Sequence, residues 1–143
     1  MNRLHFLKNL LTGVGVAVAA PQVLHAESAP KIVEKHPNES AIMIYDEYVA
    51  GFKYYKGPKN LDKVQVDDEI KLIREPNNKH DEFAIGVHWG DKKLGYIRMD
   101  DNIVIANLLD NDIPLFCKIS EIQKEAETWE QVAISVFLLF PCK

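Results

Sequence analysis

The chain has 143 residues, of which 47% are hydrophobic and 27% charged, and this is typical of one globular domain with a buried core. Its 17 basic and 21 acidic residues give a formal net charge of −4, which excludes a uniformly basic nucleic-acid-binding surface. Any phosphate-binding surface must therefore be a local patch.

Residues 1–26 have the composition of an export signal. Arg3 and Lys8 give a basic start, and residues 10–20 form an apolar run of about half the length that a membrane-spanning helix needs. The segment also resembles a twin-arginine signal, with Leu4 in place of the second arginine. We therefore expect a bacterial protein exported to the periplasm or cell envelope, with no stable membrane span after cleavage. The alternatives are an uncleaved anchor and a cytoplasmic N-terminal helix.

Residues 27–41 are polar, contain two prolines and show no periodicity, so a linker is expected there. The folded domain is expected at residues 42–143.

Short runs of apolar, β-branched and aromatic residues, separated by turn formers, predict a mainly β domain. In residues 69–74 the apolar positions alternate with polar ones, as in a half-buried strand. Residues 90–93 have the composition of a tight turn. The expected strand segments are 42–45, 48–55, 69–74, 83–89, 94–97, 115–122 and 131–140.

One segment has a helical period. In residues 100–110 the apolar positions 104, 105, 108 and 109 recur as on one helix face, and Asp100 or Asp101 supplies an N-cap. Residues 123–130 are charged and form either a hairpin end or a helical turn. The fold class expected is a small OB-like or SH3-like antiparallel barrel of 5–6 strands with one short helix.

The sequence contains no spacing that predicts catalysis or a cofactor. Cys117 and Cys142 either pair, if the compartment is oxidising, or remain free thiols. No C-x-x-C or similar spacing predicts zinc. Glu75, Asp81 and Glu82 form a carboxylate cluster that either binds a divalent cation or is simply solvated. We expect no enzyme activity, no cofactor and no metal.

The loop at residues 75–82, EPNNKHDE, is longer than a hairpin needs, and a long polar loop between strands is often functional. It lies within a set of motifs that resembles the HIRAN domain over about residues 45–140. The motifs are GFKYYKG at 51–57, LIREPNN at 72–78, Asp81 with Ala84-Ile85, and LGYI at 94–97.

The resemblance implies a non-catalytic, OB-like module that captures the 3′-hydroxyl end of single-stranded DNA. It makes Tyr54 the aromatic that stacks on a base and Asp81 the acceptor for the terminal hydroxyl. The nucleic-acid-binding positions that it implies are Lys53, Tyr54, Tyr55, His80, Asp81, Tyr96 and Arg98.

This chain departs from the family pattern at three places. Lys53 stands where arginine is usual, and His80 stands where a second aromatic, usually tyrosine, is common. Arg98-Met99 follows the LGYI motif, where proline and then a basic residue are common.

Each proposed site residue also has an ordinary structural interpretation. Asp81 is a common loop residue that bonds the backbone. Tyr54 shares one side of a regular strand with Phe52, so if Phe52 is a core residue, Tyr54 points inward too, unless Gly51 or Gly57 marks a bulge. The competing function is an exported module that binds an envelope protein or another ligand and has lost DNA binding.

Overall fold

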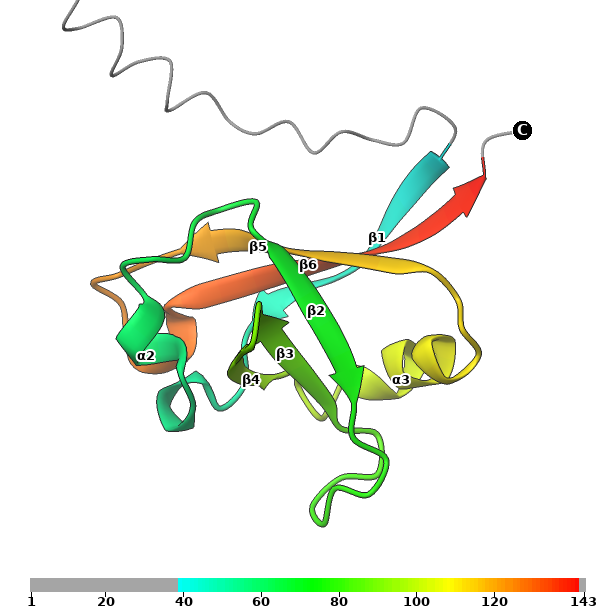
Figure 1. The fold of residues 1–143 in the computed structure, drawn as a ribbon, viewed down its shortest axis with the longest axis horizontal. Helices are drawn as coiled ribbons and strands as arrows, with labels where there is room; N and C mark the ends of the chain where they lie inside the picture. Colours follow the sequence, from blue (N-terminus) through cyan, green and yellow to red (C-terminus); the bar gives the residue numbers. More distant parts are fainter. Residues whose placement is uncertain (1–38, 142–143) are drawn as a thin grey trace, which may run out of the picture. The chain divides into compact units, whose positions relative to one another are not determined.

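A computed structural model describes residues 39–141, which form a six-stranded antiparallel sheet with short helical segments (Figure 1). The predicted export signal, most of the predicted linker and Cys142 lie outside the described residues. The strands are β1 (Glu39–Tyr48), β2 (Glu69–Arg74), β3 (Ile85–Trp89), β4 (Lys92–Tyr96), β5 (Leu115–Ile122) and β6 (Val132–Pro141). The helices are α2 (Gly57–Asn60) and α3 (Asn102–Asp110), with 3-10 turns η1 (Phe52–Tyr54) and η2 (Thr128–Glu130).

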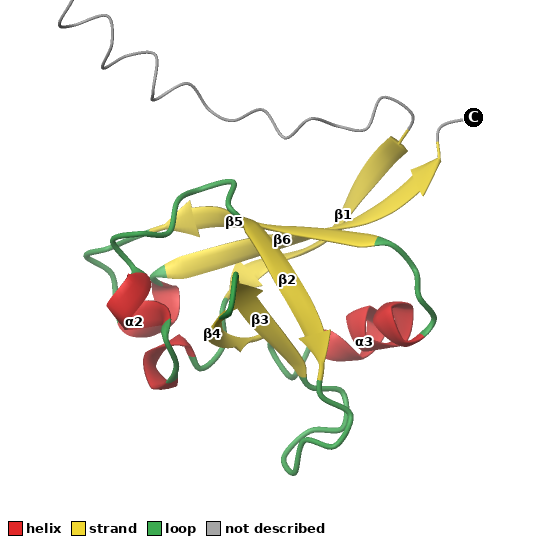
Figure 2. Ribbon diagram, viewed as in Figure 1, coloured by secondary structure: helices red, strands yellow, loops and turns green. Residues whose placement is uncertain are grey.

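The strand order is β1-β6-β5-β2-β3-β4, and every neighbouring pair is antiparallel. Figure 2 shows β2 crossing over β5 and β6, so the sheet is strongly curled. The first five residues of β6 are all buried, whereas its last two are exposed. A strand that is buried on both faces must be covered by the curled sheet, which is the arrangement of an OB-like fold.

The two edge strands meet at one point. Ala50, just after β1, forms an isolated bridge with Tyr96, the last residue of β4, through two backbone hydrogen bonds of 2.9 Å. The strand ladders alone leave the sheet open, and this bridge joins its edges. The mainly β fold with a short helix is confirmed.

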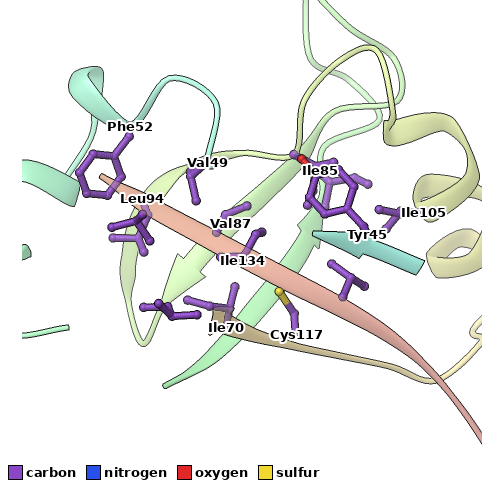
Figure 3. Packing of buried hydrophobic residues seen from close by; sticks show 14 of the residues in the cluster. Tyr45, Val49, Phe52, Ile70, Ile85, Val87, Leu94, Ile105, Cys117 and Ile134 are labelled. Carbon is purple, nitrogen blue, oxygen red and sulfur yellow. The ribbon is translucent and has the colours of Figure 1, made fainter. Parts of the chain in front are cut away.

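The hydrophobic core lies inside the curl and draws on every strand and on α3 (Figure 3). Ile85, Val87 and Leu94 on β3 and β4 are fully buried and share this core with Ile134 on β6. Ile105 brings α3 against the same cluster. Burial of each such side chain contributes about 1.5–3 kcal/mol, and the sheet and α3 share this one core.

Three element predictions need correction. Residues 52–54 form the 3-10 turn η1 instead of continuing a strand, because Gly51 has a left-handed φ of 70° that turns the chain. The strand β1 begins at Glu39, inside the segment expected to be a linker, since residues 39–41 pair with β6. The predicted helix exists, but Val104 is 65% exposed while Ile105 and Ala106 are buried.

The charged segment at residues 123–130 joins the antiparallel strands β5 and β6 and contains the turn η2, so it is a hairpin end and also includes a helical turn. Within residues 39–141, Asp101 is the N-cap residue of α3, but its side chain makes no capping hydrogen bond.

The Cys117 thiol lies on β5 and is buried, and this burial raises its pKa to about 12. Since the thiolate is the reactive form, we predict that Cys117 does not react with a disulfide reagent in the folded protein at mildly alkaline pH. A Cys142→Ser variant isolates this thiol, which should react only when urea unfolds the chain. Rapid stoichiometric labelling of the folded variant would contradict the burial.

Candidate functional site

Tyr54 stands on the turn η1 and points into solvent. Gly51 starts the turn, and the Tyr54 amide donates to the Gly51 carbonyl at 2.9 Å. In this tight turn Phe52 is buried at 2% exposure, whereas Tyr54 is 80% exposed. The two-residue alternation of a strand therefore does not apply, and the interpretation of Tyr54 as a core residue is wrong. The Lys53 ammonium lies 5.9 Å from the centre of the Tyr54 ring.

Phe52 anchors η1 to the domain. A Cβ atom at Gly57 would lie only 2.2–2.5 Å from the Phe52 ring, so the ring packs directly on the backbone of α2. This close approach requires glycine at residue 57. The exposed Tyr54 is thus carried by a turn whose neighbouring side chain is fixed in the core.

The loop at residues 75–82 extends from the body between β2 and β3 (Figure 1). Its shape comes from short-range hydrogen bonds. The Asn78 amide donates to the Glu75 carbonyl at 3.0 Å, and the Asn78 Oδ1 atom accepts from the His80 amide at 2.9 Å. Asparagine commonly bonds nearby backbone in this way, so the loop is a series of defined turns.

Arg74, at the end of β2, holds the two ends of the loop together. Its guanidinium donates to the Ala84 carbonyl at 2.7 Å and to the Glu82 carbonyl at 3.1 Å. It also forms an ion pair with Asp110 of α3, with Nε 2.8 Å from Oδ1. One residue therefore connects the loop to both β2 and α3.

Glu75 connects the loop to β4 through Lys93 and Tyr96. The Lys93 ammonium pairs with the Glu75 carboxylate and donates to the Tyr96 hydroxyl at 2.6 Å. The Tyr96 hydroxyl donates to Glu75 Oε2 at 2.7 Å. The Tyr55 ring meets the Tyr96 ring edge-on at 5.5 Å, which brings η1 to the same cluster. The Lys93 ammonium also lies 3.9 Å from the centre of the Tyr96 ring.

The charges in this cluster are mutually stabilised. Burial opposes ionisation, but the hydrogen bonds from Lys93, Tyr96 and Asn78 hold the pKa of Glu75 below its ordinary value. Burial likewise opposes the charge on Lys93, but its bonds to Glu75 and Tyr96 raise its pKa. Burial also raises the pKa of Tyr96. Glu75 and Lys93 are therefore an ion pair at neutral pH.

A Glu75→Gln variant should lose about 1 kcal/mol of unfolding free energy at neutral pH, because it removes a partly exposed ion pair. Since the folded pKa of Glu75 is depressed, its contribution to the free energy of unfolding is fully present above the ordinary carboxyl pKa. The contribution disappears as pH falls through the folded value. Urea unfolding at neutral and acidic pH measures the difference between variant and native chain, which should shrink in acid. Glu82→Gln is the control. A stability difference between Glu75→Gln and the native chain that does not change with pH would refute the ion pair between Glu75 and Lys93.

Both carboxylate oxygens of Asp81 are bonded inside the protein. Oδ1 accepts from the Phe83 amide at 2.9 Å, and Oδ2 accepts from the side-chain amide of Asn102 at 2.6 Å. Asn102 is the first residue of α3 and is 1% exposed. Asp81 thus has the ordinary loop-forming role. A carboxylate offers about four acceptor positions, so Asp81 retains capacity for a further donor.

Two other predicted site residues, His80 and Arg98, make their hydrogen bonds and ion pair with residues outside the cluster of Glu75, Lys93 and Tyr96. His80 is exposed on the loop. The Arg98 guanidinium lies 3.6 Å from Glu47, and its backbone amide donates to the Tyr45 hydroxyl at 3.3 Å. Among the described residues these contacts direct Arg98 to β1, not to the loop.

Two residues that organise the site, Lys93 and Asn102, were not predicted from the sequence. Lys93 falls in the segment that was predicted to be a tight turn, but it lies on β4, and its ammonium donates to Glu75 of the loop and to the Tyr96 hydroxyl. Asn102 was not considered. Its signal was a polar residue on the helix face that also carries Ile105 and Ala106.

A metal centre and a membrane-spanning helix find no support in the region that the structure describes. Within residues 39–141, no three His, Cys, Asp or Glu side chains are placed to hold a metal ion. The same residues contain no helix long and apolar enough to cross a membrane. Two surface cavities lie elsewhere, one beside Asp46 and Glu121 and the other beside Trp89.

Comparison with known proteins gives one family. The family model described as HIRAN domain matches residues 44–140. A crystal structure of a protein from Lactobacillus plantarum is similar with a TM-score of 0.60 and 25% sequence identity, over 71% of this chain and 97% of that chain. The crystal structure of the HIRAN domain of human HLTF is similar in fold, with a TM-score of 0.55 and 17% identity over 75% of this chain and 84% of that one. The search of curated proteins found no match.

Proposed function

The chain belongs to the HIRAN domain family, and we propose that it is a non-catalytic module that binds the 3′ end of single-stranded DNA through η1 and the loop at residues 75–82. The observation that carries this proposal is Tyr54, a large aromatic side chain held 80% exposed on a short, anchored turn. Such a side chain can stack on a base of any identity and contributes about 1–3 kcal/mol per base.

A local basic segment surrounds Tyr54 in an otherwise acidic chain. Lys53, Lys56 and Lys59 are all exposed, and residues 53–59 contain no acid. Removing residues 1–26 takes away Arg3 and Lys8 and no acid, which leaves 15 basic against 21 acidic residues, a net charge of −6. Three exposed ammonium groups on one segment can still hold backbone phosphates, and such contacts position the strand without reading its sequence.

Asp81 supplies a means of selecting an end. A carboxylate accepts a hydrogen bond from a free hydroxyl, whereas it repels the phosphate of a continuing strand. The loop that carries Asp81 is joined to η1 through Glu75, Tyr96 and Tyr55, so the stacking aromatic and the acceptor belong to one connected region. The chemistry needs no metal and no cofactor.

The test is fluorescence anisotropy of the full chain with short labelled single strands, one with a free 3′-hydroxyl and one with a 3′-phosphate. The hydroxyl strand should bind more tightly. We predict that Asp81→Ala removes this preference, by about tenfold in the ratio of the two Kd values, which is the effect of one charge-assisted hydrogen bond. Equal binding of both strands by the native chain, lost entirely at near-physiological salt, would refute end recognition.

A second candidate function is a protein-binding module of the cell envelope, which is the compartment proposed from the leader. The observation that favours it is a pair of apolar residues on β1, Ile42 and Met43, each 54% exposed, with Phe140 of β6 37% exposed. Large apolar side chains left exposed at the end of a sheet are a feature of protein-binding surfaces. These residues lie on β1 and β6, away in the sequence from η1 and the loop, so mutations can test the two candidate functions separately.

A further inference from the structure

Asn102 is a polar side chain in a position that packing would give to an apolar one. It is the first residue of α3, it is 1% exposed, and it shares its helix face with the buried Ile105 and Ala106. Its Nδ2 atom donates to Asp81 Oδ2 at 2.6 Å. Its Oδ1 atom is buried and has no hydrogen-bond partner among the described residues. A buried polar atom without a partner is rare and needs an explanation.

The Asp81 carboxylate determines which way the amide of Asn102 faces. Only the NH2 group of an amide can donate to a carboxylate oxygen, so the amide oxygen must point the other way. The unpartnered Oδ1 atom is therefore a direct consequence of the bond to Asp81. The cost of the buried, unpartnered Oδ1 acceptor accompanies the hydrogen bond from Asn102 Nδ2 to Asp81.

The bond fixes the direction of the Asp81 carboxylate. Phe83 holds Oδ1 through its backbone amide at 2.9 Å, and Asn102 holds Oδ2 from α3. Two donors from two different elements leave the carboxylate no free rotation. The acceptor positions that remain on its oxygens therefore point in set directions, which a single donor would not achieve.

We propose that Asn102 is a positioning residue that determines end specificity, because it aims the free acceptor positions of Asp81 at the terminal hydroxyl. This inference rests on the proposed function and adds to it a residue of α3 that does not touch the strand. It also explains why the buried position is polar. An apolar side chain at residue 102 would keep the domain as stable, but it would not orient Asp81 for selection between a hydroxyl and a phosphate.

The test uses Asn102→Leu in the full chain, because leucine has nearly the same shape and lacks the donor. The quantity measured is the ratio of Kd values for the 3′-phosphate and 3′-hydroxyl strands. We expect the ratio to fall by about tenfold, the effect of one misdirected charge-assisted hydrogen bond, while the Kd for the phosphate strand stays the same. The variant should remain folded, with a Tm within about 5 °C of the native chain.

Two further variants separate positioning from a general structural role. In an Asp81→Ala background, Asn102→Leu should change the ratio no further, since both residues act through the same carboxylate. Ser135→Ala is the matched control, because Ser135 is also buried and donates to an aspartate, Asp46, at 3.0 Å. Its ratio should equal that of the native chain. An unchanged ratio in Asn102→Leu, or an equal fall in the Asp81→Ala background, would overturn the inference.

Hydrogen exchange distinguishes failure of this inference from failure of the proposed function. If Asn102 orients Asp81, exchange of the Phe83 amide should quicken in Asn102→Leu, whereas exchange of the core residue Val87 should not. A native chain with no end preference refutes the proposed function and, with it, the specificity role. A native preference with unchanged Phe83 exchange in the variant refutes the positioning role alone.

Discussion

Gly95→Ala is expected to destabilise the domain by about 3 kcal/mol or more and to disturb the site at the same time. Gly95 has a φ of 156°, a backbone conformation that residues other than glycine rarely adopt. A Cβ atom there would lie 2.3 Å from the Ala50 carbonyl oxygen and 2.7 Å from Val49 Cγ1. The first of these neighbours is backbone and cannot move without breaking the bridge between Ala50 and Tyr96.

The same bridge positions the site. Ala50 leads directly into η1, and Tyr96 carries the hydroxyl that bonds Glu75 of the loop. Urea unfolding measures the lost stability, and strand binding at a temperature where the variant is folded measures the effect on the site. Gly90→Ala is the control, since Gly90 has a φ of 59° but no atom within 4 Å of the added Cβ.

The control variant should lose only about 1 kcal/mol, from backbone strain alone. A Gly95→Ala variant no less stable than Gly90→Ala would contradict the close approach of Gly95 to the Ala50 carbonyl.

Tyr54→Ala should weaken binding of single strands by about 1–3 kcal/mol, or roughly five- to 150-fold in Kd, through loss of base stacking. The unfolding free energy should hardly change, because the side chain is 80% exposed. Tyr54→Phe keeps the ring and should retain most of the affinity. Fluorescence anisotropy and urea unfolding, measured on the same preparations, give both quantities.

Trp129→Ala is the matched control for Tyr54→Ala, since Trp129 is also an exposed aromatic, at 63%, and lies on η2. It should bind like the native chain. If Tyr54→Ala and Trp129→Ala bind equally well, base stacking on η1 is not how this protein holds nucleic acid.

The sequence predicted the β fold because its signals are local. Alternation in residues 69–74, turn formers at 90–93 and the helical period near 105 each act over a few residues. The structure has β2 and α3 at these places and a β3–β4 turn at residues 90–91, although Lys92 and Lys93 already belong to β4. The joining of the sheet edges was not predictable in the same way. It depends on Ala50 meeting Tyr96, residues far apart in the sequence, and on the unusual φ of Gly95.

The site was predictable only in part for the same reason. The aromatic at residue 54 follows from the motif, but its exposure depends on the turn that Gly51 starts, which a strand pattern does not reveal. Lys93 and Asn102 have no motif of their own. Their roles come from long-range contacts with Glu75 and Asp81, which only the folded chain brings together.

The most direct test of a nucleic-acid interface at η1 and the loop is an NMR titration of the full ¹⁵N-labelled chain with a short single strand that has a free 3′-hydroxyl. We expect saturable changes in the amide signals of residues 53–55 and 77–83, with smaller changes at the start of α3. Signals from Ile42, Met43 and Phe140 should not move. Changes confined to those three residues, or no saturable change at any residue, would contradict a nucleic-acid interface at η1 and the loop.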